Sequence, residues 1–205
     1  VRSLKIATEA TSRILNKVRY WCSWYAYGWD IDYKKIIATL KVIKQHKLPF
    51  THILIDDGWT TWGDWQNPDQ TRFPNIAQTV KEIHTNHLKA GLWLAPFLAS
   101  KKSQLFKNHP DWFVQYQKRY VQGLKTMPIW ESVLPQQYLL NLELPVVQKF
   151  LTDSIDQAID KWHFDLLKLD FLYAPYFNPN YLSDDIPHNQ IKWLLSYIKR
   201  AHPKI

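Results

Sequence analysis

The chain has 205 residues, of which 46% are apolar and 21% charged, and this length provides one sizeable hydrophobic core but not two comfortable domains. The formal net charge is +8, yet the Lys and Arg residues are scattered along predicted helices, so we expect no nucleic-acid partner. No apolar run approaches the roughly 18 residues of a membrane-spanning helix, and a single cysteine, Cys22, excludes an internal disulfide framework.

The apolar pattern divides most of the chain into four pairs, each an apolar strand followed by an amphipathic helix. In chain order the predicted pairs are strand 19–25 with helix 33–46, strand 51–55 with helix 75–88, strand 91–94 with helix 146–161, and strand 164–172 with helix 188–201. Asp30 or Asp32 is expected to cap the first of these helices. Between 98 and 145 the pattern weakens, and Pro and Gly residues predict a long excursion of short pieces.

Strands that are apolar throughout and alternate with helices predict an α/β fold, with a parallel sheet covered by helices. A doubly wound sheet and a (β/α)8 TIM barrel both satisfy this order. The fingerprint Gly-x-Gly-x-x-Gly is absent, and conspicuous polar and aromatic residues stand at the strand ends, where barrels place their active sites. We therefore expect residues 19–205 to supply roughly the first four strand–helix units of a barrel, with two open sheet edges.

Lys168 and Asp170 lie two residues apart near the end of the fourth predicted strand. Side chains two apart on a strand point to the same face, so the ammonium and carboxylate groups are expected to lie together at the barrel mouth. A neighbouring cation favours the charged form of a carboxylate, which a carboxylate nucleophile requires. A structural ion pair, or simple exposure at the strand end, is an alternative that the spacing leaves open.

Asp56 and Asp57 follow the second predicted strand directly and precede Gly58. Adjacent carboxylates at a strand end can accept hydrogen bonds from ligand hydroxyls or bind a divalent cation through oxygen. A helix cap followed by a turn is the structural alternative. The ends of the first and third predicted strands offer Trp24 and Trp93 rather than further carboxylates, so we expect no metal.

Aromatic residues make up 15% of the chain and include 11 Trp. Trp24 and Trp93 lie at the ends of predicted strands, where either could stack on the C–H face of a sugar. Core packing is the alternative for both. Trp59, Trp62 and Trp65 fall in the loop after the second strand, and we expect an exposed cluster of indoles there.

Seven short segments stand out along the chain, in this order: Trp21-Cys22-Ser23-Trp24-Tyr25, Ile55-Asp56-Asp57-Gly58-Trp59, Gly63-Asp64-Trp65, Phe73-Pro74, Gly91-Leu92-Trp93-Leu94-Ala95-Pro96-Phe97, His109-Pro110-Asp111-Trp112 and Leu167-Lys168-Leu169-Asp170-Phe171-Leu172-Tyr173. Each segment is weak evidence alone. All seven in this order, across about Tyr20 to Tyr173, resemble the catalytic barrel of glycoside hydrolase family 36, the microbial α-galactosidases or melibiases.

The resemblance implies retaining hydrolysis of terminal α-galactosides through a covalent galactosyl-enzyme. The nucleophile of the family is the aspartate of a Lys-x-Asp strand, which matches Asp170, and the lysine, here Lys168, contacts sugar hydroxyls. The paired aspartates and pocket tryptophans of the family, which bind hydroxyls or form walls, match Asp56, Asp57, Trp24 and Trp93. The implied partner is an α-galactoside oligosaccharide, with no cofactor and no membrane.

The chain departs from the family pattern in several places. The acid/base aspartate of the family lies on a strand after the nucleophile strand, and residues 171–205 offer no candidate, so we expect it beyond residue 205. The family usually has Asp where this chain has Asn141, and segment 118–135 has no clear match. Residues 1–18 resemble the helix that connects to the barrel, and residues 19–205 resemble a partial catalytic domain, expected to be inactive alone.

Two alternatives stay open. A galactosyltransferase on the same scaffold, similar to the raffinose synthases, would share the nucleophile and differ in the acceptor. A catalytically incomplete sugar-binding relative would account for the missing acid/base residue. The expected location is cytoplasmic, and a homo-oligomer is compatible with the sequence.

Overall fold

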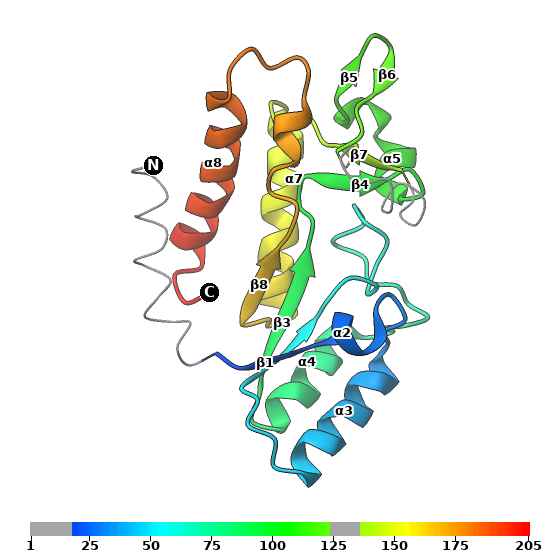
Figure 1. Ribbon diagram of the computed structural model, residues 1–205, viewed down its shortest axis with the longest axis vertical. Coiled ribbons are helices and arrows are strands. Elements are labelled where there is room, and N and C mark those ends of the chain that lie inside the picture. The colour runs from blue at the N-terminus through cyan, green and yellow to red at the C-terminus, as the bar shows by residue number, and fades with distance from the viewer. Residues whose placement is uncertain (1–17, 124–135) are drawn as a thin grey trace.

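The computed structural model describes residues 18–123 and 136–205 (Figure 1). Four parallel strands form the main sheet in the order β1-β2-β3-β8, which is also their order in the chain. These strands are β1 (Tyr20–Cys22), β2 (His52–Ile55), β3 (Lys89–Leu94) and β8 (Leu166–Leu169). The predicted α/β class and parallel sheet are therefore confirmed. Residues 1–17 of the expected connecting helix and residues 124–135 of segment 118–135 lie outside the described residues.

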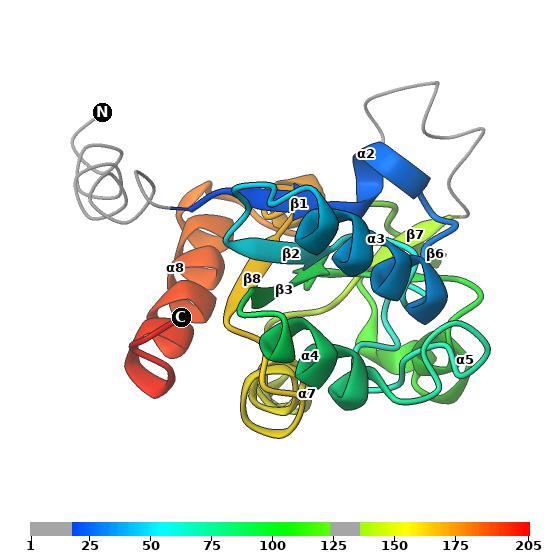
Figure 2. The ribbon, with the colours of Figure 1, turned by 90° about the horizontal axis from the view of Figure 1, so that it is seen from below.

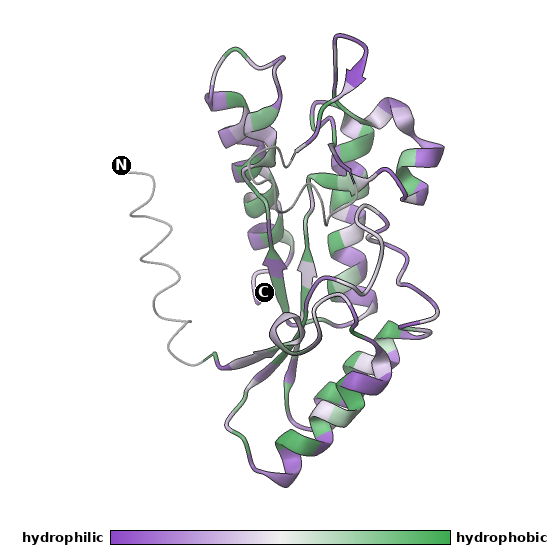
Figure 3. Cartoon of the chain, turned by 45° about the vertical axis from the view of Figure 1, so that its right-hand side comes forward, coloured by the Kyte–Doolittle hydropathy of each residue, from purple (hydrophilic) through white to green (hydrophobic). Residues whose placement is uncertain are grey.

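Four longer helices accompany the strands: α3 (Tyr33–Gln45), α4 (Ile76–Thr85), α7 (Pro145–Asp156) and α8 (Asp185–Ala201). The Asp32 side chain caps α3 by accepting a hydrogen bond from the backbone N–H of Lys35. Seen from below, α4 and α7 lie on the same side of the sheet (Figure 2). Apolar and polar residues alternate along the helices (Figure 3), as the 3.6-residue period of amphipathic helices requires.

The core forms where the apolar faces of the helices meet the sheet. The buried helix residues repeat at intervals of three and four, as in Ile36, Leu40 and Ile43 of α3 and Ile76, Val80 and Ile83 of α4. All of β2 is buried, and β3 is buried from its second residue onward. The edge strand β8 differs, since each of its four residues is only half-buried.

The first predicted strand is wrong beyond Cys22. Residues Ser23–Tyr27 form the short helix α2, which ends at Gly28 with a φ of 53°, a left-handed conformation that favours glycine. The Ser23 hydroxyl accepts a hydrogen bond from the backbone N–H of Asp56 at 2.9 Å. This side-chain hydrogen bond follows the last paired residues of β1 and β2, Cys22 and Leu54. Beyond it the chain continues as a helix instead of a strand.

The excursion between 98 and 145 contains several short elements. Strands β4 (Leu98–Ser100) and β7 (Gln137–Leu139) pair antiparallel, as do β5 (Gln115–Tyr116) and β6 (Arg119–Tyr120). The helical pieces are α5 (Gln104–Asn108) and the 3₁₀ turn η1 (Pro110–Trp112). The predicted alternation of short pieces is confirmed, whereas the pairing of β4 with β7 was not predicted.

The remaining elements complete α7 and follow β8. A π-helical segment, η2 (Gln157–Lys161), continues α7, and a 3₁₀ turn, η3 (Ala174–Phe177), follows β8. In the part of the chain that the structure describes, no helix combines the length and apolar character needed to cross a bilayer. The described strands form an open sheet with β1 and β8 at its edges, so closure into an eight-stranded barrel stays a prediction.

Candidate active site at the carboxyl ends of the strands

One cavity of about 240 Å³ lies where the parallel strands end, and it brings all six predicted site residues together. Because the four strands run parallel, their carboxyl ends meet at one edge of the sheet. The predicted residues in its lining come from α2, from β3 and β8, and from the positions directly after β2 and β8: Trp24, Asp56, Asp57, Trp93, Lys168 and Asp170.

Lys168 connects two carboxylates across the sheet. Its Nζ atom lies 2.8 Å from Oδ2 of Asp56 and 3.9 Å from Oδ2 of Asp170. Partial burial alone would lower the pKa of Lys168, but the hydrogen bond and the charge of Asp56, with the charge of Asp170, outweigh it and raise that pKa. The ammonium group therefore stays charged and faces the cavity.

Asp56 is held by donors on both oxygens. Its Oδ2 atom accepts hydrogen bonds from Lys168 and from the Cys22 thiol, whose Sγ atom is 3.2 Å away. Its Oδ1 atom accepts one from the backbone N–H of Asp57. The Asp56 side chain is only 3% exposed, so these contacts fix its orientation and compensate its buried charge.

Asp57 lies between two indoles. Its Oδ2 atom accepts a hydrogen bond from Trp29 at 2.6 Å, and its Oδ1 atom accepts one from Trp62 at 2.8 Å. Burial raises the pKa of Asp57 to about 6, although both indole hydrogen bonds act in the opposite direction. Trp29, Asp57 and Trp62 together form what we call the indole clamp.

Asp170 has its carboxylate partly exposed to the cavity, with 39% of the side chain accessible. The Trp93 indole donates to Oδ2 at 3.1 Å, and the backbone N–H of Phe171 donates to Oδ1 at 2.9 Å. Phe171 has a φ of 52°, which is unusual for a bulky residue and occurs where a site requires a particular orientation. These contacts fix the orientation of an accessible carboxylate that lines the cavity.

Three residues that the sequence analysis did not assign to the site also line the cavity: Trp29, Trp62 and Phe171. The rings of Trp62 and Phe171 lie 5.3 Å apart between centroids, and Trp62 lies 5.0 Å from Trp93. Trp24 and Trp29 form a second pair at 5.3 Å. Phe171 directly follows Asp170, and that adjacency was the available sequence signal. The resulting cavity combines aromatic walls with carboxylates and one ammonium group, a composition typical of sugar sites.

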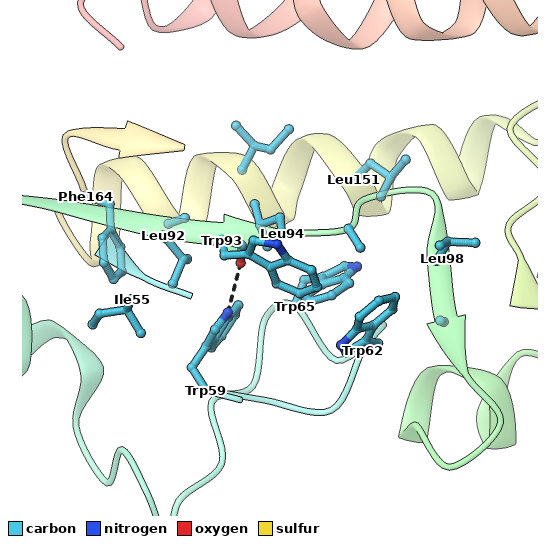
Figure 4. Close-up of a cluster of buried hydrophobic side chains, with 14 of the residues drawn as sticks. Ile55, Trp59, Trp62, Trp65, Leu92, Trp93, Leu94, Leu98, Leu151 and Phe164 are labelled. Atoms are coloured by element: carbon cyan, nitrogen blue, oxygen red, sulfur yellow. Dashed lines mark hydrogen bonds between the residues drawn. The ribbon is translucent and has the colours of Figure 1, made fainter. Parts of the chain in front are cut away.

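The expected exposed cluster of indoles in the loop after β2 is wrong. Trp59, Trp62 and Trp65 are 0%, 6% and 1% exposed. The loop folds back onto β3, where Trp59 donates a hydrogen bond to the backbone oxygen of Trp93 at 2.9 Å (Figure 4). Trp59 also packs against Trp162, which directly follows η2. Trp59 and Trp65 are therefore core residues, and Trp62 joins the core to the cavity.

The carboxylates of the cavity are directed at protein donors. Asp56 faces Lys168 and Cys22, and Asp57 faces two indoles.

Within the described ranges, the one group of side chains with metal-binding spacing is Asp156, Asp160 and His202, which lies near the ends of α7 and α8. His202 already hydrogen-bonds Asp156 at 2.8 Å.

Comparison with known proteins identifies the family of this chain. The family model described as Melibiase matches residues 9–178. Alpha-galactosidase 1 of Pediococcus pentosaceus is 31% identical over 157 residues, which are 72% of this chain and 20% of that protein. Probable alpha-galactosidase C of Aspergillus oryzae is 30% identical over 88% of this chain and 24% of its own length. The chain thus spans about a quarter or less of these relatives.

Solved structures agree with the sequence matches. TtGalA, the alpha-galactosidase from Thermus thermophilus, matches with a TM-score of 0.73 and 30% identity, over 90% of this chain and 36% of that one. The GH36 alpha-galactosidase AgaA from Geobacillus stearothermophilus matches with a TM-score of 0.69 over 91% of this chain and 26% of that one. Its identity is 18%, so this likeness concerns the fold alone. From the match of the family model and of these relatives, the chain belongs to the melibiase family.

Proposed function

We propose that the complete protein is a retaining glycoside hydrolase that releases terminal α-galactose from α-galactoside oligosaccharides. The observation that carries the proposal is the cavity in which an accessible carboxylate, Asp170, faces the ammonium group of Lys168 among aromatic walls. Its relatives are named alpha-galactosidases. The structure of TtGalA was determined in complex with p-nitrophenyl alpha-D-galactopyranoside and with stachyose.

In this proposal Asp170 attacks the anomeric carbon and forms a covalent galactosyl-enzyme, which water then hydrolyses. The indole of Trp93 and the backbone N–H of Phe171 hold the Asp170 carboxylate, which reduces its freedom before attack. Lys168 and Asp56 bind sugar hydroxyls, because an ammonium donor and a carboxylate acceptor lie 2.8 Å apart. Asp57 accepts a further hydroxyl hydrogen bond.

Trp24 and Trp93 form walls that pack against the apolar C–H face of the sugar. Both line the cavity, and the Trp93 indole also binds Asp170. This arrangement combines apolar contact with hydrogen bonds, which together fix the orientation of a hexose ring.

A retaining enzyme needs a second carboxyl group about 5–5.5 Å from the nucleophile, to protonate the leaving oxygen and then activate water. The other described carboxylates of the cavity are Asp56 and Asp57, and the oxygens of both already accept hydrogen bonds from protein donors. Since the family pattern has this residue on a strand after the nucleophile strand, we propose that the acid/base residue lies beyond residue 205. We also place the open sheet within a (β/α)8 barrel, in which a further strand would cover β8.

The test uses the complete protein with p-nitrophenyl α-galactoside, and the β-anomer as control. We expect nitrophenol release from the α-anomer only, with free galactose as product. Asp170→Ala should lose at least 10³-fold in turnover, as removal of a covalent nucleophile does. Added azide should restore turnover, because it forms a C–N bond at the anomeric carbon as nitrophenolate leaves, and the product should be the β-galactosyl azide.

Three outcomes would contradict the proposal. Transfer of galactose to a sugar acceptor in place of water would identify a transferase. Binding of galactosides without any turnover by a folded protein would identify a sugar-binding relative. An α-galactosyl azide from the Asp170→Ala variant would assign Asp170 to acid/base chemistry instead of nucleophilic attack.

A further inference from the structure

A second cavity, of about 280 Å³, lies beside the first one. The two cavities share the three residues of the indole clamp, whereas Lys168 and Asp170 line only the first. The other lining residues of the second cavity come mainly from the loop after β2 and from strands β4 and β7. The second cavity is therefore a separate space behind the clamp, of similar size to the cavity assigned to galactose.

Gln137 of β7 lines this second cavity with an unsatisfied carboxamide. The residue is 4% exposed, and neither its Nε2 nor its Oε1 atom has a hydrogen-bond partner among the described residues. Burying an amide without partners costs free energy, and most buried polar groups have partners. A ligand that offers one acceptor and one donor side by side would satisfy both atoms at once, and two neighbouring hydroxyls have this pattern.

Ser100 of β4 lies directly opposite Gln137 in the antiparallel pair. Opposite residues of such a pair point to the same face, with Cβ atoms about 5 Å apart. Ser100 is 1% exposed, and its hydroxyl oxygen accepts a hydrogen bond from the backbone N–H of Lys102. The hydroxyl proton is then free to bind a ligand oxygen, so Ser100 and Gln137 form a polar floor.

The remaining walls favour a neutral ligand with apolar faces. The indole N–H groups of Trp29 and Trp62 are bound to Asp57, so toward the second cavity these rings offer aromatic surface. The wall carries two carboxylates, Asp57 and Asp69, and two cations, Arg72 and Lys102. Arg72 binds the backbone oxygen of Trp29 and lies 3.7 Å from Asp69. The charges of the wall therefore balance, which favours a neutral ligand.

We propose that the second cavity binds a neutral hexose unit. The carboxamide of Gln137 binds two neighbouring hydroxyls, the Ser100 hydroxyl donates to a third oxygen, and the C–H face of the sugar packs against Trp29 and Trp62. Asp57 couples the two cavities, because a ligand that packs on either indole restrains the group that orients this carboxylate. The site does not depend on whether Asp170 is a nucleophile.

The experiment measures sugar binding to the complete protein by calorimetry and ligand-observed NMR, in an Asp170→Ala background that prevents turnover. The probes are D-galactose, D-glucose and D-fructose. We expect two binding events for at least one of them. Gln137→Leu should weaken the second event about tenfold or more, because two hydrogen bonds are lost, while the first event is unchanged. Gln115→Leu, which alters an exposed carboxamide of β5, is the matched control.

The thermal midpoint without sugar separates ligand binding from a structural role. Gln137→Leu should not lower it, because the substitution removes an unsatisfied buried amide. Three results would overturn the proposal: a single binding event for all three sugars, a second event that Gln137→Leu leaves unchanged, or displacement of the second sugar by inorganic sulfate, which would indicate an anion site. The experiment measures sugar binding and not turnover. It therefore tests this proposal even if the protein has no hydrolase activity.

Discussion

The Nζ atom of Lys168 lies 2.8 Å from the Oδ2 atom of Asp56, although 112 residues separate the two in the chain. The contact crosses from β8 to the end of β2, with β3 between the two strands. It supplies the cationic partner of a carboxylate that is 3% exposed. The same ion pair thus stabilises the sheet and presents an ammonium group to the cavity.

Lys168→Met should lower the free energy of unfolding, because the Asp56 charge then stays buried with fewer compensating groups. We expect a loss of about 1–3 kcal/mol, smaller than for a fully buried pair since Lys168 is 40% exposed. Urea unfolding measures it. Lys149→Met, which breaks the exposed pair with Asp153, should cost less than 1 kcal/mol. Equal losses of unfolding free energy in the two variants would contradict the role of Lys168 as the cation that compensates the buried Asp56 charge.

The Cys22 thiol should be unreactive in the folded protein. Burial raises its pKa to about 11, so the thiol stays protonated and donates to Asp56. Alkylation by iodoacetamide at pH 8 should be slow until urea unfolds the chain, since the thiolate is the reactive form. Cys22→Ala should destabilise more than Cys22→Ser, which keeps a donor. Rapid labelling of the native protein would contradict this contact.

Asp57 should titrate with a pKa of about 6. When folding raises the pKa of a carboxyl group, the protein becomes less stable as pH rises. The reason is that the unfolded chain releases this proton near pH 4, whereas the folded chain releases it only near pH 6. The free energy of unfolding should therefore fall across this window. The indole N–H signals of Trp29 and Trp62 in NMR spectra should both shift with an inflection near pH 6. Asp57→Asn should remove that inflection, and its persistence would exclude Asp57 as the cause.

Trp59 should contribute more to stability than a half-buried tryptophan. Trp59→Phe removes the hydrogen bond to the backbone oxygen of Trp93 at a site that is 0% exposed. The carbonyl loses its partner and the smaller ring leaves space, so we expect a loss of about 2–4 kcal/mol in urea unfolding. Trp193→Phe on the half-buried face of α8 is the control, with an expected loss below 1 kcal/mol. A negligible effect at Trp59 would place this loop outside the core.

The sequence predicted those features that depend on local spacing. Apolar runs defined the parallel strands, and a two-residue spacing placed Lys168 and Asp170 on one face. Features set by distant partners were missed. Ser23 begins a helix where its hydroxyl meets the backbone of Asp56, and the loop of Trp59 became core by folding onto β3. The opposition of Ser100 and Gln137 depends on strand pairing across 37 positions, which no local pattern reports.

The cytoplasmic location, a homo-oligomeric assembly and the roles of the six site residues stay predictions. The six residues line one cavity.

The most direct measurement is covalent trapping of the nucleophile in the complete protein. A 5-fluoro-α-galactosyl fluoride should transfer its sugar to the enzyme and slow hydrolysis of the ester, because fluorine destabilises the oxocarbenium-like transition state. Peptide mass spectrometry should then find one fluorogalactosyl group on Asp170, and none in Asp170→Asn. A label on another carboxylate, or hydrolysis that proceeds without any labelled enzyme, would contradict Asp170 as the nucleophile.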